Sequence, residues 1–565
     1  MYQQTLDPLA GSLGWSALAA AVPLVVMFVL LGVFRVRAHI AGLVGLALSA
    51  VSAVAIWGMP IGQTASAAAE GAFYGFFPIL WILINALFVY KLTVATGWFD
   101  ELGRVIRSIS DDMRILAILI AFCFGALLES LAGFGAPVAI TAAMMMAAGM
   151  GPMKSAIVAL LANTAPVAFG AMGAPVLALA GVTGLPLHEL SSMAGRQTPF
   201  IAAVVPLLLV FLVDGKRGVR QTWPVAIVAG VSFGIAQFVT SNYLTVELTD
   251  VVAAIATVAV VLGMLRFWQP GRAETAPASP LTSPVGAGAG VGVGNPRSGD
   301  TTSDATTGDD DPRFAHLSTR RRAFMAFAPY LIIIVIFSIA QIPAVKAWLV
   351  DVGSVKFAWP GLDAVDTSGK PLSQMNFTLD HLKATGTLLL LSGLVTAALY
   401  RIRIGGIVRA YKDTLVQLRW TIVTVMAVLA LAFVMNISGQ TGSMGMALAS
   451  TGGFFALLSP VVGWLGVAIT GSDTSSNSLF GVLQVTAAQQ AGLAPVLMAA
   501  TNSSAGVLGK MLSPQNLSVA VAAVGLAGAE GTLLRKLIGW SLGLLVFLTA
   551  IVYLQSTDVL GWMVP

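Results

Sequence analysis

The chain has 565 residues, of which 57% are hydrophobic and only 10% are charged, and its formal net charge is +5. Soluble domains carry about 25% charged residues, so this composition excludes an ordinary soluble protein and indicates that lipid is the main solvent. The basic residues lie in short loops beside apolar runs, so we expect no nucleic-acid partner.

Apolar runs recur along the whole chain, and a helix that spans a bilayer needs about 20 such residues. The clearest runs are residues 14–34, 38–58, 71–90, 114–128, 199–213, 222–241, 251–265, 323–345, 384–400, 420–435 and 537–555. Regions 136–184 and 443–530 are also apolar, but Gly, Pro and polar residues interrupt them. We therefore predict an all-α polytopic membrane protein with roughly 12 to 14 transmembrane helices, some of them broken or re-entrant.

Lys and Arg cluster in many of the loops, and short basic loops stay on the cytoplasmic side of a membrane. The clusters lie at residues 35–37, 104–114, 216–220, 313–322, 401–419 and 535–536. The loop 59–70, which contains no Lys or Arg, falls on the opposite side. One arrangement fits these loops, so we predict a multi-pass protein of the cytoplasmic membrane with both termini outside.

Two low-complexity sequences, GAGAGVGVG (286–294) and TTSDATTGDDD (301–311), interrupt the apolar chain. Such sequences cannot bury enough apolar surface to offset the entropy that they would lose on ordering. We therefore predict a cytoplasmic linker over residues 269–322. It separates an N-terminal membrane half (1–268) from a C-terminal membrane half (323–565).

The two halves share features that indicate an internal repeat. In one register, NTAPVAFGAMGAP (163–175) aligns with NSSAGVLGKMLSP (502–514). In another, ESLAGFG at Glu129 aligns with NISGQTG at Asn436. The registers conflict, so the sequence predicts two repeat-related halves without their alignment. Corresponding Gly- and Pro-interrupted segments in two halves point to the binding site of a transporter.

Four stretches place polar residues or helix breakers where lipid depth is expected. They are ESLAGFGAPV (129–138), NTAPVAFGAMGAPV (163–176), GSDTSSNSLFG (471–481) and TNSSAGVLGKMLSPQN (501–516). Backbone at that depth leaves the helix only where protein or a water-filled cavity covers it. The N-terminal amides of broken helices then point into that cavity, where they attract anions.

Three ionisable residues lie in these stretches: Glu129, Asp473 and Lys510. Charged groups inside a membrane are costly, so each one is a candidate functional residue. A buried carboxyl group binds a proton more readily than an exposed one. We therefore predict that Asp473 and Glu129 couple transport to protons, and that Lys510 balances the charge of an anionic substrate.

Hydroxyl and amide side chains in the same stretches are candidates to bind the substrate, because they hydrogen-bond carboxylate and hydroxyl groups. Together with Lys510, these candidates are Ser130, Asn163, Thr164, Thr474, Ser475, Ser476, Asn477, Asn502, Ser503, Ser504 and Gln515. Structural interpretations stay open. Either carboxyl group could cap a helix near the membrane interface or pair structurally with a lysine. Lys510 could extend to the membrane interface, and small hydroxyl residues also pack helices together.

No sequence pattern indicates a cofactor or a bound metal ion. The four histidines are scattered, HExxH is absent, and Cys123 is the only cysteine, so no Cys/His pair has metal-ligand spacing. The Gly- and Lys-containing phosphate loop that binds ATP is absent as well, so we expect no ATP-driven transport.

The stretches SLAGFGAPVAI (130–140), GSDTSSNSLFG (471–481) and NSSAGVLGKMLSPQN (502–516) resemble the L-lactate permease family of bacteria and archaea. The similarity covers nearly the whole chain outside residues 270–312. The resemblance implies a symporter of the cytoplasmic membrane that moves L-lactate and related small 2-hydroxymonocarboxylates, such as glycolate and D-lactate, together with protons. It does not assign roles to individual residues.

Two other interpretations of the residues stay open. Ser, Asn and backbone carbonyl groups also hold Na⁺, so a sodium-coupled carboxylate transporter fits the same stretches. An intramembrane enzyme would use Asp473 and Glu129 as acid and base, but no nucleophile or metal ligands accompany them. Two site-like halves suit alternating access, so the sequence favours a secondary active transporter over an enzyme. It does not predict the oligomeric state.

Overall fold

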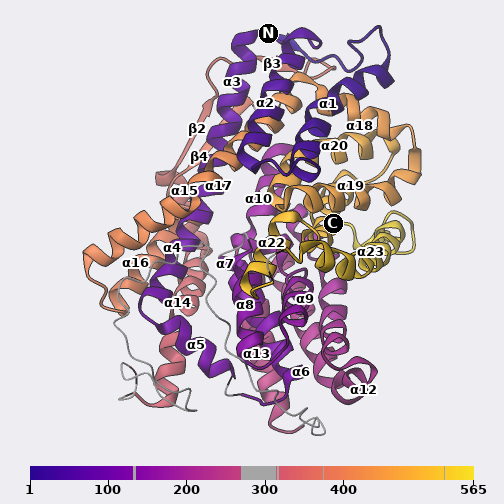
Figure 1. Ribbon diagram of the computed structural model, residues 1–565. Helices are drawn as coiled ribbons and strands as arrows, with labels where there is room; N and C mark the ends of the chain where they lie inside the picture. The colour runs from indigo at the N-terminus through magenta and orange to yellow at the C-terminus, as the bar shows by residue number, and fades with distance from the viewer. Residues whose placement is uncertain (108, 132–134, 269–313, 315–316, 373–374, 527) are drawn as a thin grey trace.

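A computed structural model describes residues 1–107, 109–131, 135–268, 314, 317–372, 375–526 and 528–565 (Figure 1). Most of the predicted linker, residues 269–313 and 315–316, lies outside the described residues, as do residues 132–134 of the first polar stretch. Helices make up most of the described chain, and its strands form two short pairs. This architecture confirms the prediction of an all-α polytopic membrane protein.

The helices before the linker are mostly apolar, as is typical of helices buried in protein and lipid, except one amphipathic helix at residues 98–107. They are α1 (Leu13–Gly32), α2 (Ala38–Ala55), α3 (Ile61–Tyr74), α4 (Trp81–Ala95), α5 (Trp98–Arg107), α6 (Met113–Leu116), α7 (Gly125–Leu131), α8 (Ala136–Ala147), α9 (Pro152–Ala162), α10 (Gly170–Thr183), α11 (Leu187–Ala194), α12 (Thr198–Tyr243) and α13 (Thr249–Leu265). Two π-helical segments, η1 (Gly75–Leu80) and η2 (Ala117–Phe124), join α3 to α4 and α6 to α7. A 3₁₀ turn, η3 (Val167–Phe169), precedes α10.

The helices after the linker follow the same pattern. They are α14 (Thr319–Ala340), α15 (Pro343–Gly353), α16 (Thr385–Leu399), α17 (Ile404–Ser438), α18 (Gln440–Ala449), α19 (Phe455–Thr470), α20 (Asp473–Ala491), α21 (Pro495–Lys510), α22 (Pro514–Ala523) and α23 (Glu530–Gln555). Short 3₁₀ turns, η5 (Gly452–Phe454) and η6 (Gly561–Met563), precede α19 and follow α23.

Nine helical segments among the described residues are long and apolar enough to cross a membrane, or ten if the bent pair α9 and α10 forms one span. The sequence predicted more crossings, about 12 to 14. The difference has a physical reason. Helix α12 holds two apolar arms, joined at a break where Asp214 and Gly215 leave helical geometry. In addition, the apolar helices α8, α13 and α16 have only 10–17 residues.

The two halves of the chain are interleaved rather than set side by side (Figure 1). Helix α17 packs against α2 and α3, and α16 packs against α4. The α3–α17 contact is close, because a Cβ atom at Gly71 would lie 2.5 Å from the carbonyl oxygen of Leu429. In the centre, α10 of the first half packs against α20 of the second half.

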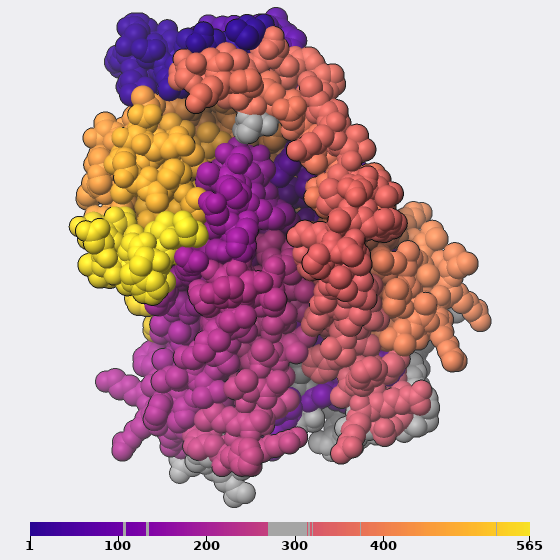
Figure 2. Space-filling view, turned by 180° about the vertical axis from the view of Figure 1, so that it is seen from behind, coloured from indigo at the N-terminus to yellow at the C-terminus, as the bar shows by residue number. Residues whose placement is uncertain are grey.

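The four strands lie outside the helical core. Strand β1 (Tyr2–Gln3) pairs in parallel with β3 (Ala364–Val365), and β2 (Ser354–Ala358) pairs antiparallel with β4 (Asn376–Asp380). Figure 2 shows the segment that begins at α14 along one edge of the molecule, reaching the end that carries the N-terminus. The strands therefore tie the second half of the chain to the N-terminus.

The order of elements favours one of the two repeat registers. In the first half, α7 is followed by a left-handed glycine (Gly135), the short α8, then α9, a break and α10. In the second half, α17 is followed by a left-handed glycine (Gly439), the short α18, then α19, a break and α20. This order supports the register that pairs Glu129 with Asn436. The alternative register pairs Asn163, at a helix end, with Asn502, in the middle of α21.

Candidate functional site

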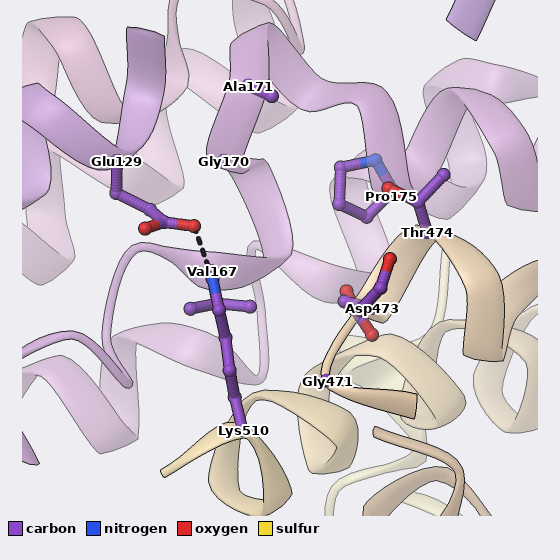
Figure 3. A pocket seen from close by; sticks show the side chains of 10 residues that line it. Glu129, Val167, Gly170, Ala171, Pro175, Gly471, Asp473, Thr474 and Lys510 are labelled. Atoms are coloured by element: carbon purple, nitrogen blue, oxygen red, sulfur yellow. Dashed lines mark hydrogen bonds and ion pairs between the residues drawn. The ribbon is translucent and has the colours of Figure 1, made fainter. Parts of the chain in front are cut away.

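One small cavity lies between the two helix breaks, and its volume is about 30 Å³. All four polar stretches identified in the sequence contribute to it. The lining residues are Glu129, Val167, Gly170, Ala171, Pro175, Gly471, Ser472, Asp473, Thr474 and Lys510. Figure 3 shows Glu129 and Lys510 on one side of this space, with Asp473 and Thr474 on the other.

The first break separates α9 from α10, which are bent by 63° relative to each other. Helix α9 ends at Asn163, and Pro166 follows, which has no N–H to continue a helix. Residues 171–173 then adopt positive φ angles of 45°, 55° and 77°. The left-handed conformation costs roughly 1–2 kcal/mol for each residue other than glycine, so the surrounding packing holds this segment in place.

The second break separates α19 from α20. Gly471, with a φ angle of +74°, ends α19, and Ser472 caps the next helix by accepting a hydrogen bond of 3.2 Å from the backbone N–H of Ser475. Asp473 is therefore the first residue of α20. The sequence TGSD folds in this way because glycine tolerates the left-handed turn and serine is a favoured N-cap residue.

A buried ion pair between Glu129 and Lys510 lines one side of the cavity and joins the two halves of the chain (Figure 3). Glu129 is 2% exposed and Lys510 is 6% exposed. The second carboxylate oxygen of Glu129, Oε2, accepts a hydrogen bond of 2.9 Å from Nδ2 of Asn163. The carboxylate fits because residue 170 is glycine, where a Cβ atom would lie 3.0 Å from Oε1 of Glu129.

Asp473 is a second buried carboxyl group, 3% exposed, with incomplete hydrogen bonding. Its Oδ2 accepts a hydrogen bond of 2.5 Å from the hydroxyl group of Ser503 on α21. Its Oδ1 is buried and has no hydrogen-bond partner among the described residues. A Cβ atom at Gly506 would lie 2.7 Å from that Oδ1, so glycine leaves the space that this oxygen occupies.

Three more of the predicted residues form a network behind the cavity. Asn502 donates to Oδ1 of Asn477 at 2.9 Å and to the hydroxyl group of Ser476 at 3.4 Å. Asn477 in turn donates to the carbonyl oxygen of Pro175 at 3.0 Å, which ties α20 to the start of α10. This network fixes the position of one break relative to the other.

The remaining predicted residues are dispersed. Ser130 and Thr164 donate hydrogen bonds to carbonyl groups three residues earlier in the chain, those of Leu127 and Leu161. The Ser504 hydroxyl group is buried without a partner among the described residues. Ser475 lies in the first turn of α20, and the exposed Gln515 lies beside Gly471. The binding roles of these residues, and of the others, stay predictions.

The sequence interpretation missed the buried carboxyl group of Asp250, in the first turn of α13. The only signal was an acidic residue directly before the apolar run 251–265, a position that usually lies in a solvated loop. Within the described residues, no group of three or more His, Cys, Asp or Glu side chains is placed to hold a metal ion.

The arrangement is suited to binding one small anion. The lining holds two carboxyl groups, Glu129 and Asp473, but one ammonium group, Lys510. The positively charged N-terminal end of α20 also opens at the cavity, and helix N-termini attract anions. An anion that enters would compete with Glu129 for Lys510.

Sequence comparisons with known proteins point to permeases of small carboxylates. The sequence profile of the family described as L-lactate permease matches residues 16–559. The chain is 39% identical to the L-lactate permease of Bacillus subtilis (strain 168), with 100% of both chains covered. It is 41% identical to the glycolate permease GlcA of Escherichia coli (strain K12), with 98% of both chains covered. Among solved structures, the YdaH transporter of Alcanivorax borkumensis is 15% identical, with a TM-score of 0.41 and 86% of both chains covered.

Removing either partner of the ion pair should destabilise the protein more than removing both. Glu129→Gln or Lys510→Met leaves one buried charge unpaired, at a cost of about 3–5 kcal/mol. The double variant leaves no unpaired charge, so its loss should be smaller than the sum of the two single losses. Thermal unfolding of the purified proteins in detergent measures the difference.

Lys154→Met is the matched control, because Lys154 on α9 is exposed and makes no ion pair among the described residues. It should unfold at the wild-type temperature. Strictly additive losses in the double variant would show that Glu129 and Lys510 do not interact in the folded protein.

Proposed function

The chain belongs to the L-lactate permease family, and on that premise we propose that it transports L-lactate and related small 2-hydroxymonocarboxylates with protons across the cytoplasmic membrane. Glycolate and D-lactate belong to this substrate class. The family and its relatives are permeases, so the chain is a transporter and not an enzyme. No cofactor is part of the proposal.

The observation that carries the proposal is the buried Lys510, held by Glu129 between two helix breaks. A lysine at such a position needs an anionic partner, because an unpaired buried charge is strongly unfavourable. In the empty protein Glu129 is that partner. A substrate carboxylate of similar size and charge can replace it.

The balance of charge then explains coupling to protons. When the substrate carboxylate pairs with Lys510, Glu129 keeps its negative charge but no longer has a cationic partner. One proton on Glu129 restores the net charge that the site had before substrate entered. The loaded and the empty sites then carry the same net charge. The protein can therefore turn either site from one side of the membrane to the other at a similar electrostatic cost.

In this proposal Asp473 binds a different group of the same substrate, its 2-hydroxyl group. Its Oδ1 is a buried acceptor without a partner among the described residues, and a 2-hydroxyl group is a hydrogen-bond donor. Asp473 also stays the second candidate for the coupled proton, as the sequence predicted. Thr474 and Ser472, which line the same side of the cavity, supply further hydroxyl groups.

Orientation in the membrane follows from the basic loops. Helices α5 and α6, which carry the cluster at residues 104–114, lie at the end of the molecule opposite the N-terminus (Figure 1). Basic loops stay cytoplasmic, so we place the N-terminus outside, and the C-terminus outside as well. Labelling Gly62→Cys in intact cells with an impermeant thiol reagent tests this, since Gly62 is exposed and Cys123 is buried.

Proteoliposomes separate proton coupling from sodium coupling. With an inward proton gradient and no sodium, labelled L-lactate should accumulate above its external concentration, and a protonophore should abolish the accumulation. An inward sodium gradient alone should give none. Accumulation that requires sodium would replace the proton proposal with the sodium alternative, and failure to exchange or accumulate lactate would remove lactate as a substrate.

Accumulation and exchange of lactate in the same vesicles show which carboxyl group carries the coupled proton. Glu129→Gln should lose uphill accumulation but keep exchange of lactate, because exchange by the loaded carrier moves no net proton. Asp473→Asn is the paired variant. If only Asp473→Asn shows this separation, the proton is on Asp473 and the role given to Glu129 is wrong.

Substrate selectivity should follow the number of charges and hydroxyl groups. Propionate lacks the 2-hydroxyl group, which leaves a buried acceptor unpaired at a cost of about 1–3 kcal/mol, so it should compete weakly with labelled lactate. Succinate brings a second carboxylate, and the lining of the cavity holds only one ammonium group. If propionate competes with labelled lactate as well as unlabelled lactate does, the proposed contact to the 2-hydroxyl group is wrong. If succinate competes as well as lactate, the proposal of a site for a single negative charge is wrong.

A further inference from the structure

Asp250 is fully buried and lies outside the cavity lining. Its Oδ1 accepts a hydrogen bond of 3.0 Å from Nε2 of Gln237 on α12. Its Oδ2 is buried and has no hydrogen-bond partner among the described residues. A carboxylate in this setting would be an unpaired buried charge, so the neutral acid is the favoured form of Asp250 in the empty protein.

The surroundings of Asp250 connect it to Glu129. Helix α13, which carries Asp250, packs against α7, which carries Glu129. Gln237 also donates to the carbonyl oxygen of Ala165 at 3.4 Å. Ala165 lies in the break that begins at Asn163, the residue that holds Glu129. The two carboxyl groups are therefore connected through Gln237, the backbone of residues 163–165 and the Asn163 side chain, which together form a connecting frame.

The other charged groups on the elements around α13 do not take part in this frame. Helix α12 carries Asp214, Lys216, Arg217 and Arg220 at its central break, which lies well before Gln237 in the same helix. Helix α10 carries no charged residue, and η2 carries only the buried thiol of Cys123 as a titratable group. Glu129 on α7 is thus the charged neighbour that matters for Asp250.

Buried polar groups lie between Asp250 and the surface in two hydrogen-bonded sets, which the peptide bond between Gln197 and Thr198 joins. Thr198 donates to Oε1 of Gln237 at 2.9 Å. The preceding residue, Gln197, is fully buried and donates to Gln555 at 3.1 Å. Gln555 reaches the carbonyl oxygen of Arg196, and the partly exposed Arg196 side chain binds the backbone near the C-terminus.

We propose that Asp250 relays the coupled proton to Glu129, a role that rests on the proton-coupled transport proposed above. When substrate takes Lys510, the O–H bond of the Asp250 acid breaks and a new O–H bond forms on the Glu129 carboxylate. Asp250 is left as a carboxylate, and a hydronium ion from the outside solution gives it a proton and becomes water. When substrate leaves on the cytoplasmic side, the O–H bond of Glu129 breaks, its proton passes to cytoplasmic water, and the carboxylate pairs with Lys510 again.

The test compares net proton-driven uptake of labelled lactate with lactate exchange in proteoliposomes. Asp250→Asn keeps the shape of the side chain but carries no transferable proton. Net uptake should fall at least about 10-fold, since a positioned proton-transfer group typically contributes that much or more, while exchange stays near the wild-type rate. Asp250→Glu should recover net uptake in part. Thr257→Val is the control and should alter neither rate, because the buried Thr257 on the same helix donates its hydroxyl group to the helix carbonyl of Ala253.

The outcomes separate this relay from the proposed function. If wild-type protein accumulates lactate and Asp250→Asn does so at the same rate, the relay is wrong and proton coupling stands. If wild-type protein shows no proton-driven accumulation, the proposed function itself fails. If Asp250→Asn does not reach the membrane, Gln237→Met takes its place, because it removes the hydrogen bond that orients Asp250. Equal loss of net uptake and exchange in that variant would overturn the relay.

Discussion

The ion pair between Glu129 and Lys510 is the interaction on which the site depends. It brings together residues that are 381 positions apart, one on α7 and one at the end of α21. Two opposite charges inside a membrane protein are tolerated when they pair and when their remaining hydrogen bonds are satisfied. Asn163 supplies such a bond, and glycine at position 170 leaves room for the carboxylate. Both helix breaks are arranged around this pair.

The same pair constrains how the protein can work. A site with one ammonium group has no spare positive charge for an additional anion, so entry of a carboxylate must be accompanied by a proton or a cation. Asp473 and Asp250 are two more buried carboxyl groups, and in the proposed function they take part in substrate binding and proton transfer. Their unpartnered oxygen atoms, within the part of the chain that the structure describes, are the features that suit hydroxyl recognition and proton transfer.

Much of this organisation was predictable from sequence, because lipid permits few arrangements of the backbone. Composition and apolar runs predicted the helices, and the four polar stretches all reach one cavity. The sequence left open that Glu129 or Asp473 pairs with a lysine, and only the tertiary structure decides that Glu129 pairs with Lys510. Asp250 was missed because an acidic residue before an apolar run usually lies in solvent. The repeat register needed the order of elements, because short motifs matched in two conflicting ways.

The exchange of Glu129 for substrate on Lys510 is tested most directly by counting protons when lactate binds. Purified protein in weakly buffered detergent solution receives saturating L-lactate at neutral pH, and a pH indicator follows the change. The account predicts uptake of about one proton for each lactate bound, because Glu129 loses its cation and becomes neutral. Glu129→Gln should bind lactate without taking up this proton. Binding to the wild-type protein with no proton uptake would contradict the account.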